Sequence, residues 1–278
     1  MTPYFTGTLL NSGFEGGGGG AIFVGDGAEV EWDVTAFTSN TAFWDGGAFG
    51  AKSWSSTTSV SRILMRGPTY FVNNTCGGNG GGISLRAVSS VSFGAMEVIF
   101  SGNSADLAGG AFFIWDTGSQ TALSGVAFKK NFAQVGGAVY TSESQSTVTI
   151  DECRFVGNAA SFSGGAMENA GRVSCTKTFF GGNEAAIGGA LRLTGFTSLD
   201  NIDFVENISE DGEGAAISNI GIMSTFSNIS FVVSSYTCNP GSYLAYVSCE
   251  GQPGYSGSRL LAQVLSYLHV HVKIRLKL

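Results

Sequence analysis

The sequence is poor in charge, in proline and in cysteine. Of its 278 residues, 13% are charged, four are proline and five are cysteine, whereas about 25% charged residues is typical. So little charge, together with 42 glycines, argues against an ordinary helix-rich enzyme. Disorder is excluded as well, because 43% of the residues are hydrophobic and 21 are Phe. The net charge of −7 disfavours nucleic acid and anionic lipid over the surface as a whole.

Long apolar runs are missing too. Residues 1–20 lack a basic segment followed by an apolar run, and no window holds about 18 uninterrupted apolar residues. We therefore predict no secretory signal and no transmembrane helix, so that membrane attachment would need parts outside this chain. Because repeat material begins almost at once, we expect a fragment of a longer protein or a misassigned start. The sequence specifies no oligomeric state.

Two short motifs alternate along the chain. The first is Phe-x-x-Asn, and its pairs are Phe37/Asn40, Phe71/Asn74, Phe100/Asn103, Phe128/Asn131, Phe155/Asn158, Phe180/Asn183 and Phe204/Asn207. The second is Gly-Gly, then a small residue and an apolar one; its pairs include Gly46/Gly47, Gly109/Gly110, Gly136/Gly137, Gly164/Gly165 and Gly188/Gly189. Successive asparagines are 34 residues apart at first and 24 at the end. So short a period fits one solenoid coil per repeat, not a four-stranded propeller blade.

The residues that follow each Gly-Gly motif alternate as they do in a strand. The first is apolar in all eight coils: Ile22, Phe49, Ile83, Phe112, Val139, Met167, Leu191 and Ile217. The next varies freely, so we expect it to face solvent: Phe23, Gly50, Ser84, Phe113, Tyr140, Glu168, Arg192 and Ser218. We predict an all-β fold, a right-handed parallel β-helix of about seven to eight coils with a short cysteine-containing C-terminal extension.

Stacking of such coils would turn each repeated position into a ladder. Coils about 4.8 Å apart would bring the motif phenylalanines into an aromatic ladder and the asparagines into an inward amide ladder that satisfies backbone groups. The Gly-Gly pairs are expected at sharp corners that need positive φ. A phosphate-binding loop is not indicated, because no Gly-x-Gly-x-x-Gly opens a helix and no lysine stands at the P-loop position. We predict no cofactor.

The pattern divides the chain into four parts. Residues 1–18 are a cap or a truncated coil, residues 19–236 the β-helix, residues 237–257 a short turn-rich segment, and residues 258–278 a basic and apolar tail. In the third part, Cys238 and Cys249 lie close together, and we expect them to form a disulfide. The tail fits an amphipathic or membrane-surface segment, an edge strand, a disordered end or read-through of non-coding sequence.

Residues suited to catalysis or metal binding are few. Glycoside hydrolysis needs carboxylates clustered on one face, and the candidates are Asp151, Glu152, Asp200, Asp203, Glu206, Glu210, Asp211 and Glu213. The last three are expected in one acidic turn, solvated or weakly calcium-binding. Both histidines lie in the tail, which excludes a Ser-His-Asp triad on the repeats. Cysteine spacing does not fit zinc, and Cys153 and Cys175 are interpreted as buried thiols rather than an inter-coil disulfide. We predict no catalytic and no metal-binding residues.

One coil carries an insertion within residues 52–68. It includes Trp54, Arg62 and Arg66, and tryptophan and arginine are enriched at binding hot spots. The hypothesis is that these three residues bind a cell-surface glycan or protein; a tolerated Ser/Thr-rich surface loop is the alternative. Among three glycosylation sequons, Asn73 is the plausible acceptor.

The repeats resemble those of a known family. Alternation such as Phe128-Lys-Lys-Asn131 followed by Gly136-Gly-Ala-Val139 resembles the repeat of the chlamydial polymorphic outer-membrane proteins. The resemblance implies a non-enzymatic, surface-exposed or secreted adhesin, at the cell surface or in the outer membrane. That family's signal peptide and C-terminal barrel are not seen in this sequence. The segment from Cys238 to Tyr255 is similar to the start of a growth-factor-type or ephrin-receptor-like module. A carbohydrate-active β-helix enzyme, a polysaccharide lyase or glycoside hydrolase, is the alternative function.

Overall fold

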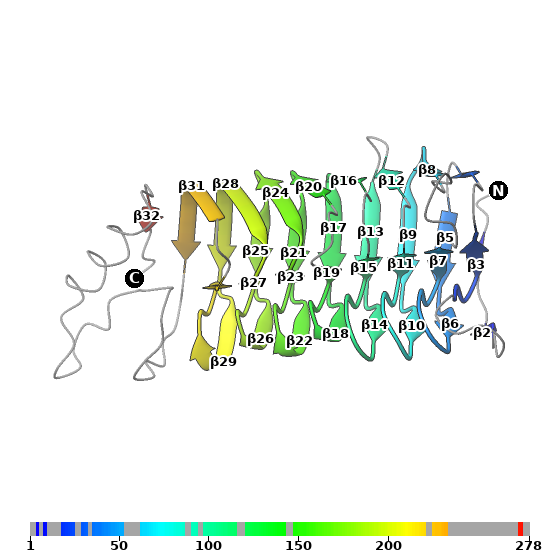
Figure 1. Cartoon of the computed structure of the whole chain (residues 1–278), viewed down its shortest axis with the longest axis horizontal. Helices are drawn as coiled ribbons and strands as arrows, with labels where there is room; N and C mark the ends of the chain where they lie inside the picture. The colour runs from blue at the N-terminus through cyan, green and yellow to red at the C-terminus, as the bar shows by residue number, and fades with distance from the viewer. Residues whose placement is uncertain are drawn as a thin grey trace.

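The computed structural model is an elongated parallel β-helix, with coils stacked from the N-terminal to the C-terminal end along its long axis (Figure 1). It describes residues 4–5, 8–9, 18–25, 29–32, 35–52, 62–86, 90–93, 97–115, 120–142, 147–220, 224–232 and 272–274. Every helix or strand element in those ranges is a strand, and the strands pair in parallel. The predicted all-β fold and parallel β-helix are confirmed; the right-handed sense stays a prediction.

The largest sheet has 16 strands in two stacks that meet at β28. The first stack carries the motif phenylalanines and consists of β1 (Tyr4–Phe5), β5 (Thr35–Thr38), β9 (Thr69–Val72), β13 (Val98–Ser101), β17 (Val126–Lys129), β21 (Arg154–Val156), β25 (Phe179–Gly181) and β28 (Phe196–Val205). The second stack consists of β4 (Glu29–Trp32), β8 (Arg62–Met65), β12 (Ser90–Phe93), β16 (Gln120–Ser124), β20 (Thr147–Asp151) and β24 (Arg172–Thr176). Two further strands, β31 (Ser224–Val232) and β32 (Val272–Ile274), continue from β28.

Two sheets of eight strands complete each coil. The second sheet follows the motif asparagines: β2 (Thr8–Leu9), β6 (Thr41–Ala42), β10 (Thr75–Cys76), β14 (Ser104–Ala105), β18 (Phe132–Val135), β22 (Ala159–Ser163), β26 (Glu184–Ile187) and β29 (Ile208–Glu213). The third sheet follows the Gly-Gly corners: β3 (Ile22–Val24), β7 (Phe49–Lys52), β11 (Ile83–Arg86), β15 (Phe112–Trp115), β19 (Val139–Thr141), β23 (Met167–Asn169), β27 (Leu191–Leu193) and β30 (Ile217–Asn219). The regular turns number about six, slightly fewer than predicted.

The interior is filled by a stack of phenylalanine rings. Phe37, Phe71, Phe100, Phe128, Phe155, Phe180, Phe204 and Phe231 form it, one from each coil, with neighbouring ring centroids 4.6–5.3 Å apart. The rings are within 14° of parallel. The apolar residues after the Gly-Gly corners pack beside this stack, as in the contact of Phe100 with Phe112. The spacing equals that of the strands, so the ladder is set by the backbone.

The motif asparagines form a second, buried ladder beside the rings. Asn131 is typical: its Oδ1 accepts hydrogen bonds from the backbone N and the Nδ2 of Asn103, both at 3.0 Å. Its Nδ2 donates to Phe100 O at 3.1 Å and to Asn158 Oδ1 at 2.9 Å. One side chain thus connects three coils and satisfies backbone groups at a corner where the sheet ladder is interrupted.

The amide ladder runs in one direction through all seven motif coils. Each Nδ2 donates to the Oδ1 of the next asparagine, at 2.9–3.0 Å, in the order Asn40, Asn74, Asn103, Asn131, Asn158, Asn183 and Asn207. Asn74 and Asn183 also donate to Phe37 O and Phe155 O, at 3.0 and 3.1 Å. All seven residues are buried. Their amides are therefore used inside the solenoid and are not available to a ligand.

The two glycines of a corner serve different purposes. Gly136 has φ of 59°, in the left-handed region that a residue with a Cβ rarely adopts. Gly137 does not have positive φ; a Cβ there would overlap the carbonyl oxygens of Gly165 and Ala159 in the next coil.

This division of roles is the same at five corners. The first glycines, which have positive φ, are Gly46, Gly109, Gly136, Gly164 and Gly188. The second glycines, which do not, are Gly47, Gly110, Gly137, Gly165 and Gly189. A Cβ on any of these second glycines would lie 2.1–2.2 Å from a carbonyl oxygen of a stacked corner or of the strand before it. The expectation that both glycines of a pair provide positive φ is therefore wrong for the second one, and close approach of stacked corners explains it.

Left-handed residues also recur just before the motif asparagines. Ser39, Asn73, Lys130 and Glu206 have φ of 53–55° there, and Gly102, Gly157 and Gly182 occupy the same place in other coils. A single left-handed residue turns the chain from the first stack into the second sheet, at a conformational cost for residues other than glycine.

Candidate binding face

The outer face of the third sheet differs from the prediction that it is open to solvent. Gly50, Ser84, Phe113 and Ser218 on it are buried, with Ser84 only 2% and Phe113 1% exposed. Backbone of the preceding corner covers Gly50, because a Cβ there would overlap the carbonyl oxygen of Gly18, and the side chains of Arg86 and Tyr140 lie against Phe113. A position that varies freely in the sequence is thus covered by backbone in part of the solenoid.

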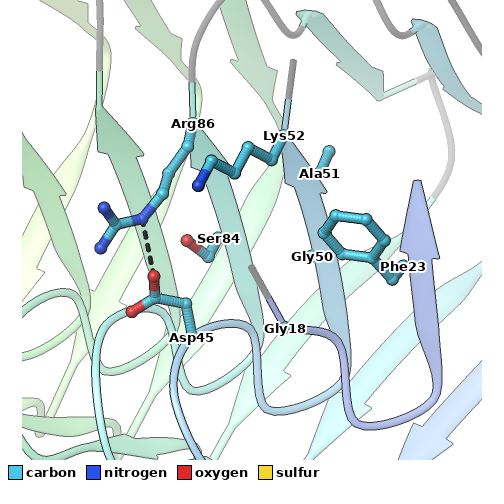
Figure 2. A pocket seen from close by; sticks show the side chains of 8 residues that line it. All are labelled: Gly18, Phe23, Asp45, Gly50, Ala51, Lys52, Ser84 and Arg86. Atoms are coloured by element: carbon cyan, nitrogen blue, oxygen red, sulfur yellow. Dashed lines mark ion pairs between the residues drawn. The ribbon is translucent and has the colours of Figure 1, made fainter. Parts of the chain in front are cut away.

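A shallow hollow lies on this face near the N-terminal end (Figure 2). Its empty volume is about 140 Å³, including the open space at its mouth, and it is lined by Gly18, Phe23, Asp45, Gly50, Ala51, Lys52, Ser84 and Arg86. Phe23 at one side is 39% exposed. The lining residues come from β3, β7 and β11 and from the corners before β3 and β7. Backbone stacking therefore places them together from three different coils.

Asp45 is the buried anion of the hollow. Its carboxylate is held from two sides, since Oδ2 lies 2.6 Å from Arg86 Nε and Oδ1 accepts hydrogen bonds from the backbone N and Nδ2 of Asn79 at 2.8 and 3.0 Å. The residue is 4% exposed. A buried carboxylate requires such partners, because desolvation of an unpaired charge is costly.

Arg86 is held in place by aromatic rings as well as by Asp45. Its guanidinium carbon lies 5.5 Å from the ring centroid of Phe113 and 5.6 Å from that of Trp115. Lys52, Arg86 and Trp115 are in register on β7, β11 and β15, so two cations and an indole follow one another along the solenoid. Trp115 is 48% exposed, which leaves much of its surface open to a ligand.

Ser84 supplies the unusual polar atom of the hollow. Its hydroxyl is buried and has no hydrogen-bond partner among the described residues. Figure 2 shows this hydroxyl between the side chains of Asp45, Arg86 and Lys52. Buried hydroxyls are nearly always satisfied by protein or by an ordered molecule, so Ser84 is one of the few exceptions among the described residues, with Thr35 and Thr121.

Farther along the same face the side chains pair with one another. Tyr140 stacks on Phe113 at 5.5 Å, and Glu168 accepts a short hydrogen bond from the Ser163 hydroxyl, with Arg192 Nε 4.0 Å from its carboxylate. Burial raises the pKa of Glu168, while Ser163 and Arg192 oppose that shift. This part of the face is internally satisfied, in contrast to the hollow.

The three predicted binding residues are not assembled by the described part of the chain. Trp54 lies outside the described residues, as does the side chain of Arg62, although Arg62 belongs to β8. Arg66 is exposed and forms an ion pair with Glu31, including a hydrogen bond from Nη2 to Oε2 at 3.2 Å. The insertion is shorter than residues 52–68, since β8 pairs with β4 and β12.

The carboxylates weighed for catalysis are held separately. Asp151 accepts a hydrogen bond from Thr176 at 2.6 Å, and Glu152 pairs with Lys177 at 3.2 Å. Asp200 accepts from Ser227 and Asn228, and these bonds lower its pKa. The described residues contain no group of three or more His, Cys, Asp or Glu side chains suited to a metal ion.

The acidic segment before the last Gly-Gly corner is a strand, not a turn. Glu210, Asp211 and Glu213 lie in β29, which pairs with β26. The pairing shifts register opposite Ala185 and Ile187, and all three residues are exposed. The acidic segment is therefore a solvent-exposed, irregular strand and not the expected turn.

The described cysteines are free, buried thiols. Burial is the main cause that raises the pKa of Cys76, Cys153 and Cys175 to about 12. Such thiols remain protonated and unreactive, which agrees with the interpretation of Cys153 and Cys175 as core residues. Cys238 and Cys249 lie outside the described residues.

Two further predicted features have a place in the structure. Asn73 is exposed and adopts a left-handed turn conformation, whereas Asn207 is buried in the amide ladder. In the tail, Val272–Ile274 form β32, which pairs in parallel with β31 at the C-terminal end of the large sheet. Glycosylation of Asn73 stays a prediction.

Register could have revealed the residues of the hollow from the sequence. Lys52, Arg86 and Trp115 all stand six positions after the first glycine of their corner motifs at Gly46, Gly80 and Gly109. Aligning the coils on that glycine places them in one outward column. The repeat register does not predict the burial of Asp45 or the lack of a hydrogen-bond partner for Ser84, because both depend on how the corner folds over the sheet.

Comparison with known proteins identifies one repeat. Residues 68–86, from just before β9 to the end of β11, match the Chlamydia polymorphic membrane protein repeat. The matched segment contains one Phe-x-x-Asn motif, one Gly-Gly corner, Ser84 and Arg86. The chain is therefore a β-helix that resembles this repeat family. No curated protein and no solved structure matched it. No helix long and apolar enough to cross a membrane occurs in the ranges that the structure describes.

Proposed function

We propose that this chain is a non-enzymatic binding module of a cell-surface or secreted protein, with an adhesive role. The observation that carries the proposal is the match of residues 68–86 to the repeat of a surface protein family, on a β-helix that presents the exposed Trp115 in register with Arg86 and Lys52. Sites of this kind combine a few placed polar groups with aromatic surface on a rigid scaffold. The match to a polymorphic membrane protein repeat supports a surface location.

The predicted loop follows Lys52 in the chain. Lys52, the last residue of β7, lines the hollow, and residues 53–61 come directly after it. In the proposed function, Trp54 at the start of this connection adds an aromatic contact, and Arg62 and Arg66 flank the far end. The ligand class is a cell-surface glycan or protein. Carboxylates that are individually bound to Thr, Lys and Asn side chains give the enzyme alternative no support.

The test is adhesion of the purified chain to cultured cells after exchange of the loop. Residues 53–61 are replaced by a Gly-Ser linker, which keeps β8 with its fully buried Ile63 and Met65. A replacement that extended through Arg66 would remove this strand and test folding instead. The matched control replaces residues 143–146, the equivalent connection between β19 and β20.

We expect the loop variant to lose adhesion and to keep the β-sheet circular dichroism spectrum, while the control binds like wild type. Unchanged adhesion by a folded loop variant would remove the loop from the function. A wild-type chain that binds no cell type tested would contradict the adhesive role itself.

A further inference from the structure

We propose that the corner between the second and third sheets binds an extended, neutral β-1,4-linked glycan that lies along the solenoid axis. The second sheet and this corner carry six of the ten large hydrophobic side chains that are exposed among the described residues: Phe43, Trp44, Leu107, Phe132, Phe162 and Ile208. The inference goes beyond the proposed function, since no residue of the third sheet or of the insertion takes part in it.

Three of these side chains lie in one row, which we call the apolar row. Trp44, Leu107 and Phe162 each stand two positions before the first glycine of a corner, and they are 45%, 50% and 51% exposed. Gly78 and Gln134 hold the same position in the coils between them. A Cβ on Gly78 would overlap the carbonyl oxygen of Trp44, so only glycine fits there.

Backbone contacts keep the apolar row in register from coil to coil. Leu107 N donates to Gly78 O, and Leu107 O accepts from Val135 N, both at 3.0 Å. In the last of these coils β22 has an extra residue, so that two residues, the second of them Phe162, stand opposite Gln134. A bulge of this kind turns a side chain to a new direction. Figure 1 shows the strands before these corners, β6, β10, β14, β18 and β22, next to one another along the solenoid.

The interval within the apolar row matches a glycan repeat. Coils stack about 4.8 Å apart, so positions two coils apart are separated by about 9.6 Å along the axis. In an extended β-1,4-linked chain each pyranose ring is turned over relative to the next, and the same ring face recurs at every second sugar, at nearly this interval. Trp44, Leu107 and Phe162 can therefore contact the apolar C–H faces of alternate sugars. An α-1,4-linked chain coils and does not keep the interval.

Polar groups beside the apolar row suit the hydroxyl edges of a sugar chain. Asp106 precedes Leu107 and is exposed, and Gln134 is exposed between Leu107 and Phe162. The amide offers donors and an acceptor, and the carboxylate accepts, so both can bind sugar hydroxyls. Apolar surface with a few placed polar groups is what ligand sites in proteins commonly provide.

A membrane surface or a protein partner fits the apolar row less well. Strands β6, β10, β14, β18 and β22 and the corners after them contain no Lys or Arg, whereas surfaces that bind anionic lipid carry cations. Arg192 on β27 lies 5.9 Å from the Phe162 ring centroid, and Glu168 accompanies it as a counter-ion. The core of a protein interface is a contiguous cluster of side chains, but a glycine and an amide interrupt this row. The same scarcity of cations favours a neutral glycan over an acidic one.

The experiment measures binding of oligosaccharides to the full chain by titration calorimetry. The matched probes are cellohexaose and maltohexaose, which contain the same glucose units joined by β-1,4 and by α-1,4 bonds. We expect cellohexaose to bind at least about tenfold more tightly than maltohexaose. Cellobiose, which reaches one side chain of the row at a time, should also bind at least about tenfold more weakly than cellohexaose.

Variants of the apolar row test its residues one by one. Trp44→Ala and Phe162→Ala should each weaken cellohexaose binding by about tenfold, as loss of an aromatic hot-spot residue does. Leu107→Trp should strengthen it by roughly threefold, because an indole adds stacking surface in the middle of the row. The matched control is Phe196→Ala, which removes a ring of similar exposure, 44%, from β28 in the large sheet and should leave the affinity unchanged. All four side chains are exposed, so thermal midpoints should stay close to that of wild type.

Equal affinity for cellohexaose and maltohexaose would overturn the proposal, as would unchanged cellohexaose binding by folded Trp44→Ala and Phe162→Ala. Chitohexaose, which carries acetamido groups on the same backbone, distinguishes the source of the glycan. Tighter binding of chitohexaose than of cellohexaose, lost in the same variants, would support the site with an N-acetylated chain as its ligand. If neither β-linked chain binds but phosphatidylcholine vesicles bind and Trp44→Ala releases them, the row is a lipid-binding surface and the proposal is wrong.

The outcomes separate this inference from the adhesive function. If the wild-type chain adheres to cells, the loop variant does not, and no β-linked chain binds, the glycan site is wrong and the proposed function stands. If cellohexaose binds as expected and the chain adheres to no cell, the glycan site stands and adhesion does not.

Discussion

At the scale of single residues, two separate reasons for glycine can be tested: lack of room for a Cβ, and a positive φ. Gly137 lacks room for a Cβ because the Gly165 and Ala159 carbonyl oxygens of the next coil occupy that space. Gly182 is a matched contrast: its φ is 60°, and no described atom lies within 4 Å of a Cβ built there. Gly137 is limited by space and Gly182 by backbone conformation.

We predict that Gly137→Asn destabilises by more than about 3 kcal/mol, because overpacking against backbone exceeds the usual side-chain range. Gly182→Asn should cost less than about 1 kcal/mol, since asparagine tolerates the left-handed region. Urea unfolding midpoints with a common slope would measure both. Equal losses in the two variants would contradict the spatial explanation of Gly137.

Glu168 gives a residue-level prediction with a pH dependence. Burial raises the pKa of its carboxyl above the usual 4.5, so the folded chain holds the proton more tightly than the unfolded chain. Its contribution to stability is thus fully present below pH 4.5 and is lost as pH rises through the raised pKa. Glutamine at position 168 does not titrate. The free energy of unfolding of Glu168→Gln, relative to that of wild type, should therefore increase between pH 4.5 and the raised pKa and stay constant above it.

The control is a variant of Ser163, whose hydroxyl donates a hydrogen bond to Glu168 and thereby favours the charged carboxylate. Ser163→Ala removes the hydrogen bond to the carboxylate, so the pKa should rise further and the loss of stability with pH should extend to higher pH. Unfolding free energies from pH 4 to pH 8 would show both effects. Parallel curves for wild type and Glu168→Gln would contradict the assignment.

At this scale, the sequence predicts the roles of side chains better than it predicts the conformation of the backbone. The buried phenylalanines and asparagines follow from a regular repeat, because their chemistry leaves few alternatives to burial in a stack. The left-handed position before each asparagine is occupied by Ser39, Lys130 and Glu206 as well as by glycine, so residue type conceals it. The burial of Gly50 depends on the Gly18 carbonyl of the preceding coil, and Phe113 is covered by the side chains of Arg86 and Tyr140 from neighbouring coils, which local alternation cannot show.

At the scale of elements, the amide ladder is the feature that connects strands of the first stack to those of the second sheet. Asn131 joins Asn103, Phe100 and Asn158 through four hydrogen bonds. We predict that Asn131→Leu destabilises the chain by at least about 1–3 kcal/mol, the cost of leaving buried polar groups unsatisfied. The midpoint of urea unfolding measures the loss.

A matched amide on the same coil provides the control. Gln134 is exposed on β18, so Gln134→Leu should change stability by no more than about 0.5 kcal/mol. An Asn131→Leu chain that unfolds at the wild-type urea concentration would contradict a structural role of the ladder.

Strands were predictable where the repeat is regular and obscure where it is interrupted. The position of β8 within the insertion illustrates the second case: Arg62–Met65 pairs with strands of both neighbouring coils, yet nothing in its local sequence separates it from a loop. Ile63 and Met65 reveal the strand only through their burial. The hollow beside Lys52 was missed for a related reason, since its residues come from three coils.

At the scale of the whole molecule, the solenoid buries its core between successive coils. Each strand pairs with its equivalents in the coils before and after, as β17 does with β13 and β21. In such arrays the free energy of unfolding is approximately the sum of the intrinsic stability of each coil and the stability of each interface between neighbouring coils. A defect in one coil should therefore weaken its neighbours first.

Phe128→Ala tests this one-dimensional behaviour. Phe128 is fully buried, with ring centroids 5.1 Å from Phe100 and 4.6 Å from Phe155, and removal of a buried ring costs about 3–5 kcal/mol. We expect amide hydrogen exchange to accelerate most in β13, β17 and β21 and progressively less toward β7 and β27. Phe132→Ala, in the same coil but 47% exposed, is the control and should leave the exchange pattern unchanged. Uniform acceleration over all coils would show that the solenoid opens as one cooperative unit, because every amide would then exchange through the same global unfolding event.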